Sequence, residues 1–315
     1  MQRRLAVVMD PIGSIKIVKD STFAMLLEAQ RRGWALQYVV PGSLGFRGGV
    51  AGGRLAALKV RDDKAGWFEL GEAAWRPLAE MDQVLMRRDP PVDADFVHDT
   101  QVLAAAQRQG AAVTNDPAGL LELNEKLAAL MFPDCIPPTL VSREAAEFKA
   151  FAAEHGEVVL KTLDGMGGRS IFRSRHGDPN FNVILETLTA DGRHLAMAQR
   201  FLPEIADGDK RVLLIDGEPV SHCLARIPQG TEFRGNLAAG GRGEVRPLTA
   251  RDREIAAIVG PEMKRRGMHF VGLDVIGGHL TEVNVTSPTC IREIDAGAGL
   301  NIAGTLFDAL ERDAA

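Results

Sequence analysis

The sequence predicts an α/β protein with two or three lobes, and three features support this fold class. The chain has 315 residues with 45% apolar and 25% charged content, which allows a sizeable core but exceeds the usual size of one domain. In the N-terminal part, β-prone runs alternate with segments of helical periodicity, the pattern of a parallel sheet. Prolines at 133–138 then interrupt the chain before a second αβ segment begins.

The chain begins with an apolar, β-prone run at 4–9 that predicts the first strand. Apolar residues then recur at helical spacing between Ser21, the expected N-cap, and Gly33, the expected C′ residue. Strand character returns at 34–40. We therefore expect a β-α-β unit at the start of the protein.

The same alternation continues with a strand at 83–87, a helix at 95–109 and a strand at 111–114. These elements complete an N-terminal α/β domain over residues 1–122. The glycine-rich segment at 42–53 shows no periodicity, so we expect it to be a surface excursion of this domain rather than a linker.

Pro117 suits the start of a helix that is expected to contain Glu125 and Lys126. The chain then becomes rich in proline before the next αβ segment. A second lobe is therefore expected to begin near residue 123.

A glycine-rich segment at 164–170 lies between a strand at 157–161 and strand character that resumes at 171. Glycines without a Cβ let backbone N–H groups approach a polyphosphate, and Lys161 at the strand end can neutralise its charge. The segment matches neither the P-loop nor the Rossmann pattern. It predicts either a nucleotide-binding flap or a plain hairpin turn with an exposed lysine.

Two alternating strands at 270–276 and 280–285 predict a β-hairpin closed by a glycine-rich turn. Only a three-residue loop ending in a bulge places the valines of both strands on one apolar face. That register sets Asp274 opposite Glu282 and leaves Asn284 on the same polar face. Such oxygen ligands suit Mg²⁺, and the alternative is an ordinary solvated strand face.

The hairpin leads into a hydroxyl-rich turn at 286–289 and then to Arg292, groups that an anionic substrate beside a metal would need. Before the hairpin, a long segment at 224–243 carries many glycines and three arginines, among them Arg226 and Arg234. Such a loop either closes over an anionic ligand and excludes water or is merely a mobile surface loop. The arginines favour the first interpretation.

The composition disfavours several classes of function. Aromatic residues make up 5% of the chain and the net charge is -5, which argues against nucleic-acid binding. The N-terminal apolar run ends at Asp10, too short for a signal peptide, and no stretch approaches a membrane span. Cys135, Cys223 and Cys290 are odd in number and far apart, so no disulfide framework or zinc motif is expected. We expect a soluble cytoplasmic protein that binds neither nucleic acid nor membrane.

Taken together, these segments resemble the ATP-grasp ligases and are most similar to the prokaryotic glutathione synthetases, over nearly the whole chain. The most specific stretches are Met9-Asp10-Pro11-Ile12, residues 19–30, Met86-Arg87-Arg88-Asp89-Pro90-Pro91, Leu163-Asp164-Gly165-Met166-Gly167-Gly168 and Asn284-Val285-Thr286-Ser287-Pro288-Thr289. The resemblance implies an ATP-grasp fold with a Rossmann-like parallel-sheet N-terminal domain at 1–122, a small central lid domain at 123–202 and a C-terminal domain with the metal site at 203–315.

The resemblance also implies roles for individual residues. The implied nucleotide contacts are Lys126, Lys161, Gly165, Met166, Gly167, Gly168, Gln199, Arg200, Phe201, Leu202, Asp209 and Arg211. The implied metal ligands are Asp274, Glu282 and Asn284. The implied catalytic contacts to phosphate and peptide substrate are Arg226, Arg234, Asn236 and Arg292.

The activity implied by the resemblance is ATP-dependent ligation of γ-glutamylcysteine to glycine through an acyl phosphate, with Mg²⁺ or Mn²⁺, in a homotetramer or homodimer. Positioning and electrostatic stabilisation suffice for this chemistry, so Cys290 is expected to be a packed residue rather than a nucleophile. One rival is another ATP-grasp ligase, which would differ in its N-terminal and large-loop residues. The other is a non-catalytic ATP-binding module, which could lose Glu282, Asn284 or Arg292 without penalty.

Overall fold

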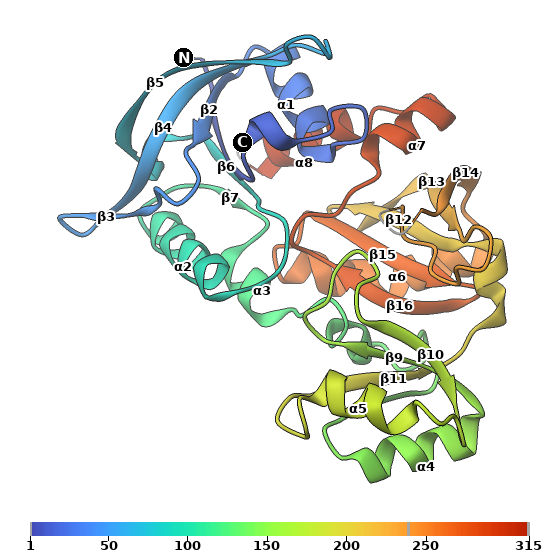
Figure 1. The fold of residues 1–315 in the computed structure, drawn as a ribbon. Coiled ribbons are helices and arrows are strands. Elements are labelled where there is room, and N and C mark those ends of the chain that lie inside the picture. Colours follow the sequence, from blue (N-terminus) through green and yellow to red (C-terminus); the bar gives the residue numbers. More distant parts are fainter. Residues whose placement is uncertain (1, 238–239, 314–315) are drawn as a thin grey trace.

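The computed structural model describes residues 2–237 and 240–313, which form three sheets with helices packed against them (Figure 1). The N-terminal sheet contains β1 (Arg4–Met9), β2 (Ala35–Val39), β3 (Gly45–Arg47), β4 (Val50–Val60), β5 (Phe68–Pro77), β6 (Gln83–Arg87) and β7 (Val113–Thr114). The central sheet contains β8 (Thr139–Ser142), β9 (Glu157–Thr162), β10 (Ile171–Arg175) and β11 (Ala196–Arg200). The C-terminal sheet contains β12 (Asp209–Ile215), β13 (Glu218–Ile227), β14 (Arg242–Pro247), β15 (Phe270–Ile276) and β16 (His279–Asn284). The α-helices are α1 (Ser21–Arg31), α2 (Ala94–Arg108), α3 (Pro117–Glu122), α4 (Ala145–His155), α5 (Phe181–Thr189), α6 (Ala250–Arg265), α7 (Ile291–Ala298) and α8 (Ile302–Asp313).

Strands β2, β1, β6 and β7 of the N-terminal sheet run parallel in that order, as the alternation of strands and helices predicts. The side chains of β1 alternate between two covered faces. Leu5 and Val7 join the apolar cluster of α1 and α8, whereas Ala6 and Val8 join the cluster of α2. Both faces are covered, which accounts for the apolar run from Leu5 to Met9.

The C-terminal helix α8 packs against the N-terminal part of the protein, and Figure 1 shows it beside α1. Trp34 meets Phe307 edge-on, with ring centroids 5.5 Å apart. Arg32 at the end of α1 pairs with Asp308 and Glu311 of α8. The two ends of the chain therefore share one core.

The glycine-rich segment at 42–53 lies within the N-terminal domain as expected, but the predicted surface excursion ends at residue 50, because residues 51–53 are buried. Strand β3 and the start of β4 run through it and extend the sheet. A Cβ on Gly52 would lie 2.4 Å from the carbonyl oxygen of Arg76 on β5. The glycine here permits two strands to approach closely. In a sequence, a cluster of glycines usually indicates a loop instead.

The start of α1 also differs from the prediction. Asp20, and not Ser21, is the N-cap, because its carboxylate accepts a hydrogen bond from the backbone N–H of Phe23 at 2.6 Å. Aspartate and serine cap helices about equally well, so their adjacency made the choice ambiguous. At the other end, Gly33 has a φ of +81°, the left-handed conformation predicted for the C′ residue.

Helix α3 is shorter than expected. Asp116 caps it and Pro117 occupies its first turn, as predicted, but the helix ends at Glu122. Glu125 and Lys126 therefore lie in the turn that follows, where the side chain of Asn124 accepts a hydrogen bond from the backbone N–H of Lys126. An asparagine that bonds the backbone two residues on is a turn signal that competes with the helix.

The C-terminal hairpin has the predicted register but reaches it by a different turn. Asp274 pairs with Glu282, and the valines of both strands lie in one buried cluster. Ile276 pairs with His279 across a two-residue turn, and a bulge beside Thr281 supplies the extra residue. The three-residue loop is therefore wrong, whereas the shared polar face is confirmed.

Each sheet falls within one of the predicted domain ranges, since the strands occupy residues 4–114, 139–200 and 209–284. The breaks near 123 and 203 remain a proposal, with α7 and α8 returning from the third range to the first. No helix in the described part of the chain is both long and apolar enough to cross a membrane.

Candidate functional site

A cavity of about 540 Å³ is lined by residues from all three sheets and the loops that join them. The predicted site residues that line it are Lys161, Gly165, Met166, Gly167 and Gly168 of β9 and the glycine loop, Gln199, Arg200, Phe201 and Leu202 at the end of β11, Asp209, Arg211 and Arg226 of β12 and β13, Arg234 and Asn236 of the large loop, and Asp274, Glu282 and Asn284 of the hairpin. Lys126 and Arg292 are the two predicted site residues that do not line it.

Lys126 lies at the base of the glycine loop, residues 163–170. Its ammonium group donates to the Glu125 carboxylate at 2.6 Å and to the Gly165 carbonyl at 2.7 Å, and the residue is 1% exposed. Burial acts to lower the pKa of Lys126, but the negative charges of Glu282 and Glu125 outweigh it and raise that pKa. The charged side chain therefore anchors the start of the loop.

The end of the glycine loop contacts the large loop that follows β13. Arg234 donates to the Gly168 carbonyl at 2.6 Å and pairs with Glu232 at 2.5 Å. Gly168 has a φ of +81°, and a Cβ there would lie 2.8 Å from the amide oxygen of Asn236. Two segments that stand far apart in the sequence thus meet over the cavity.

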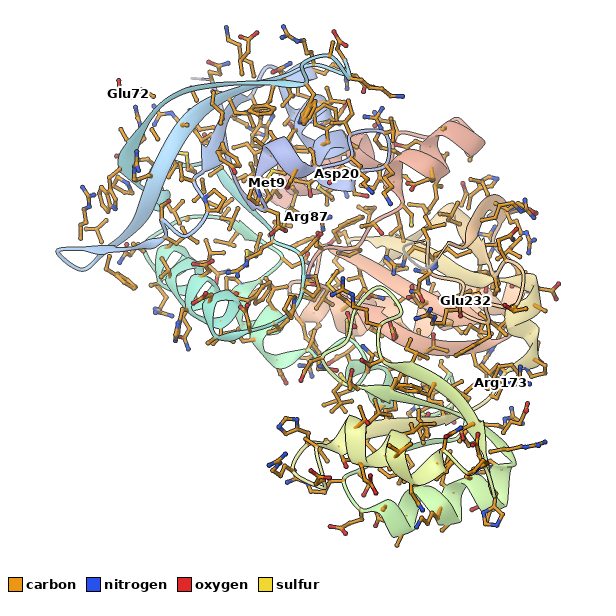
Figure 2. All side chains as sticks on the ribbon, in the orientation of Figure 1. Met9, Asp20, Glu72, Arg87, Arg173 and Glu232 are labelled. Carbon is orange, nitrogen blue, oxygen red and sulfur yellow. The ribbon has the colours of Figure 1, made fainter. Side chains whose placement is uncertain are left out.

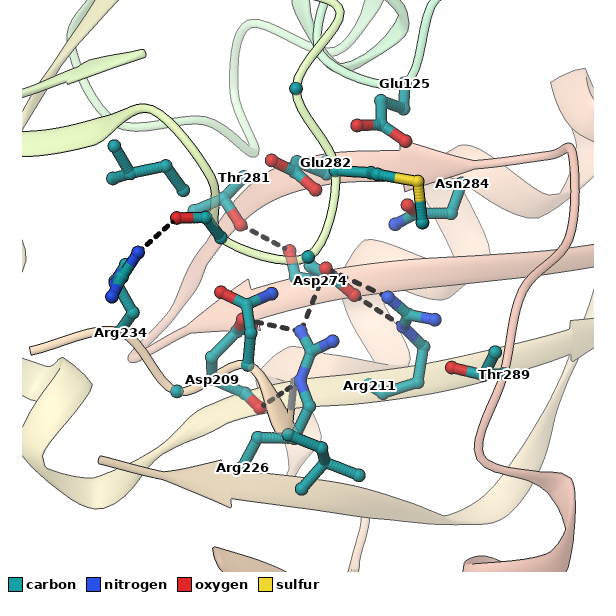
Figure 3. Close-up of a pocket in the computed structure, with 18 of the residues that line it drawn as sticks. Glu125, Asp209, Arg211, Arg226, Arg234, Asp274, Thr281, Glu282, Asn284 and Thr289 are labelled. Atoms are coloured by element: carbon teal, nitrogen blue, oxygen red, sulfur yellow. Dashed lines mark hydrogen bonds and ion pairs between the residues drawn. The ribbon is translucent and has the colours of Figure 1, made fainter. Parts of the chain in front are cut away.

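Two arginines and two aspartates form a buried network on the cavity floor (Figure 3). Arg226 lies 2.5 Å from Asp209 and 2.9 Å from Asp274, and Arg211 lies 2.6 Å from Asp274. Burial acts to raise the pKa of Asp274, but the two guanidinium groups hold it well below its usual range. For Asp209 burial dominates, so that its pKa rises to about 6 despite the pairing with Arg226.

The polar face of the hairpin fits a hard cation. Glu282 lies 3.3 Å from Lys161, and the Asn284 amide nitrogen donates to the Gly272 carbonyl, which leaves the amide oxygen for a cation. Asp274 Oδ1 accepts a single hydrogen bond and keeps a lone pair. Among the residues that the structure describes, no three His, Cys, Asp or Glu side chains form a metal cluster. A cation would therefore also need water or phosphate oxygens, as Mg²⁺ usually does.

Arg292 does not line the cavity. Its guanidinium pairs with Asp62 at 2.6 Å and lies 5.8 Å from the ring centroid of Phe23. The next residue, Glu293, lines the cavity instead. The predicted contact between Arg292 and a peptide substrate therefore finds no support in this geometry.

Sequence reasoning missed several charged residues of the cavity. Glu125 stands across from Glu282, and burial together with the Glu282 charge raises its pKa. Lys16 and Lys19 enter from the loop after β1, and Glu293 from the first turn of α7. Lys19 lies within the stretch 19–30 on which the resemblance rests, but no chemical motif marks any of these positions. Lys16 and Lys19 join the cavity because the N-terminal domain packs on the C-terminal sheet.

Comparison with known families matches almost the entire chain. The family model described as "Prokaryotic glutathione synthetase, N-terminal domain" covers residues 4–120. The model described as "Prokaryotic glutathione synthetase, ATP-grasp domain" covers residues 125–299.

Curated relatives match from end to end. The glutathione synthetase of Xanthomonas axonopodis pv. citri is 69% identical over 315 residues, which is 100% of both chains. The glutathione synthetase of Pseudomonas aeruginosa is 58% identical and covers 98% of both chains.

Solved structures share the fold at low sequence identity. The D-cycloserine synthetase DcsG superposes with a TM-score of 0.66 at 16% identity, covering 98% of this chain and 99% of that chain. The ATP-grasp ligase PsnB superposes with a TM-score of 0.61 at 17% identity, covering 99% of this chain and 98% of that one. These likenesses confirm the predicted ATP-grasp fold.

Proposed function

Because the chain belongs to the prokaryotic glutathione synthetase family, we propose that its cavity ligates γ-glutamylcysteine to glycine with ATP. The protein is an ATP-dependent ligase. The observation that carries the proposal is that the glycine loop and the hairpin meet in one cavity. Lys161 and Glu282, 121 positions apart, lie 3.3 Å from each other. Phosphates covered by the loop would thus lie against the metal face.

The nucleotide is proposed to lie between the central and C-terminal sheets. Residues 165–168 would cover its phosphates with backbone N–H groups, and Lys161 would neutralise their charge. Lys126 would act by fixing the loop, and residues 199–202 would lie behind the adenine. Asp209 Oδ1 is buried and has no hydrogen-bond partner among the described residues, so it can accept a bond from a ribose hydroxyl.

The metal is proposed to be Mg²⁺ or Mn²⁺, held by Asp274, Glu282 and Asn284 together with phosphate oxygens. When bound, it would neutralise charge on the phosphates and orient the group being transferred. Arg211 and Arg226 keep Asp274 ionised in the absence of a cation. Asp274 is thus ready to bind a cation without first losing a proton.

The proposed reaction has two steps. The cysteinyl carboxylate attacks the γ-phosphorus of ATP and displaces ADP, giving an acyl phosphate. The glycine amine then attacks the carbonyl carbon, loses a proton and displaces phosphate. Arg226, Arg234 and Asn236 line the cavity where they can stabilise the transferring phosphoryl group. Cys290 is 1% exposed, as befits a packed residue, and no covalent nucleophile is needed.

We further propose a homotetramer or homodimer and a cytoplasmic location, which rest on the family alone. Another ATP-grasp ligase activity remains the alternative. Such a ligase would share the fold, as the solved structures that superpose at 16–17% identity do. The acceptor and donor substrates therefore have to be identified by assay.

The test is ADP release by the purified chain with ATP, Mg²⁺, γ-glutamylcysteine and glycine, each omitted in turn, with the product identified by mass. We expect release to require all four components and the product to be glutathione. Release with D-alanine or another acceptor, but none with glycine, would move the assignment to a different ligase and leave the nucleotide site in place.

A further inference from the structure

The cavity extends beyond the proposed metal face to a second charged end. We call this the distal end and define it by Lys16, Lys19, Asp20, Asp89, Thr289 and Glu293, all of which line the cavity. The starts of α1 and α7 meet here, because the backbone N–H of Ile291 donates to the Ser21 hydroxyl at 3.1 Å. Figure 2 shows Asp20 at the start of α1, near Met9 and Arg87. None of these residues has a role in the nucleotide or metal chemistry described above.

Glu293 is the carboxylate at the distal end that lacks a partner. Its Oε2 atom is buried and has no hydrogen-bond partner among the described residues. A buried acceptor left without a donor is costly, and in native proteins such a group is usually satisfied by a ligand or water. Burial raises the pKa of Glu293, with Lys19 as the foremost of the cations that lower it. A cationic ligand group would satisfy this oxygen.

The other carboxylates of the distal end are already engaged or solvated. Asp20 caps α1 through the Phe23 N–H. Asp10, a cavity residue next to the distal end, accepts the Asp89 N–H at 2.9 Å. The Asp89 side chain is itself exposed. An incoming ammonium group would therefore gain most at Glu293.

Lys19 supplies the complementary charge. Its side chain is exposed and forms no ion pair with any residue in the part of the chain that the structure describes. It is close enough to act on Glu293, and the N-terminus of α1 begins two residues later. A free lysine beside a helix N-terminus favours a carboxylate ligand. The distal end thus offers one site for a cation and one for an anion.

The two ends of the cavity are joined, as a dipeptide that spans them requires. Residues 286–290 line the cavity continuously from the hairpin to α7, so the metal face and the distal end belong to one channel. In γ-glutamylcysteine, six bonds separate the reacting carboxylate from the α-carbon of the glutamyl group, roughly 8 Å when extended. That α-carbon carries an ammonium and a carboxylate, the two charges that the distal end would bind.

We propose that Glu293 and Lys19 form the subsite for the zwitterionic γ-glutamyl head, with Glu293 accepting from its ammonium group and Lys19 pairing with its α-carboxylate. This inference rests on the proposed function and deepens it. The resemblance implied a substrate contact at Arg292. The proposed contact from α7 is instead the next residue, Glu293. The subsite selects the donor substrate without taking part in phosphoryl transfer.

The test compares γ-glutamylcysteine with N-glutarylcysteine, which lacks only the α-amino group, under saturating ATP, Mg²⁺ and glycine. We expect the unaltered chain to prefer γ-glutamylcysteine roughly 10- to 100-fold in kcat/KM, the range that one charged hydrogen bond provides. Glu293→Gln should reduce this preference to within a few-fold, mainly through KM for γ-glutamylcysteine, with KM for ATP unchanged. Glu186→Gln, on the exposed face of α5, is the matched control and should keep the full preference.

A second pair tests the anion side. Lys19→Met should abolish the preference for γ-glutamylcysteine over 4-aminobutyrylcysteine, which lacks the α-carboxylate, whereas Lys149→Met on α4 should not. The subsite is refuted if both the Glu293 and Lys19 variants keep the preferences of the unaltered chain, or if kcat falls equally on all donors. If the unaltered chain does not use γ-glutamylcysteine at all, the proposed function fails instead.

Discussion

At the scale of single residues, the cavity depends on charges that compensate one another. Arg226 contacts both Asp209 and Asp274, and all three side chains are buried. A buried ion pair contributes little net stability compared with apolar packing, but removing one partner leaves an uncompensated charge. Arg226 therefore serves the fold as well as the proposed phosphoryl transfer.

Arg226→Met should destabilise the protein by about 3–5 kcal/mol, because it leaves two buried carboxylates facing each other with only Arg211 between them. Urea denaturation at neutral pH measures the free energy of unfolding. The control is Arg242→Met, which removes an arginine that is 58% exposed in its ion pair with Glu244 and should cost less than about 1 kcal/mol. Equal losses in the two variants would show that the network does not stabilise the fold.

At the scale of elements, the pairing of β4 with β5 depends on a missing side chain. Gly52→Ala would place a Cβ 2.4 Å from the Arg76 carbonyl and 2.7 Å from the Trp75 ring, so the strands must separate. We expect a loss of about 1–3 kcal/mol in unfolding free energy. Gly53→Ala is the matched control, since its Cβ would meet no atom closer than the Leu44 side chain at 3.3 Å. Thermal denaturation of both variants should show the larger loss at Gly52, and the reverse order would contradict this account.

The joint between α7 and α8 is expected to respond to pH. Asp295 accepts a hydrogen bond from the Ile302 N–H at 3.0 Å. Burial raises the pKa of Asp295 to about 6, although this hydrogen bond and the charge of Arg292 both act to lower it. The folded state then binds this proton more tightly than the unfolded state does. The contribution of Asp295 to the stability of the fold is therefore fully present below about pH 4 and is lost as the pH rises through about 6. The melting temperature of the unaltered chain relative to Asp295→Asn should therefore fall between about pH 4 and pH 6.5. A constant difference across this range would show that Asp295 titrates normally.

The sequence predicts elements wherever a residue's role is local. The alternation of β1, α1 and β2, the strand–glycine loop–strand at 157–171 and the register of Asp274 with Glu282 all follow from periodicity and turn chemistry. The course of β3 and β4 does not, because Gly52 reflects a strand that is distant in sequence. The sequence likewise does not predict the place of Glu293 in the cavity, because only the packing of α7 beside α1 brings it there.

At the scale of the whole molecule, the central domain has an apolar cluster of its own, so we expect it to move as a unit. Its apolar cluster is drawn from residues 140–198 alone. The other two clusters each combine the N-terminal and C-terminal sheets, for example Val84 with Val271 and Leu5 with Phe270. The contact of Lys126 with the glycine loop and that of Arg234 with Gly168 therefore hold the central domain over the cavity. A domain with its own core, held by few contacts, is what a hinged lid requires.

A bound nucleotide should therefore stabilise the protein by joining this body to the metal face. A non-hydrolysable ATP analogue with Mg²⁺, at about 100 times its dissociation constant, should add about 2.7 kcal/mol and raise the melting temperature by roughly 5 °C. The analogue without Mg²⁺ should give a smaller rise, because the phosphates then lack their bridge to Glu282. Glu282→Gln should keep the metal-free rise and lose the additional one, whereas Glu186→Gln on the far helix of the lid should keep both. If the rise in the unaltered chain were the same with and without Mg²⁺, the cation would not bind on the hairpin. The proposed path of the phosphoryl group past the hairpin would then be wrong as well.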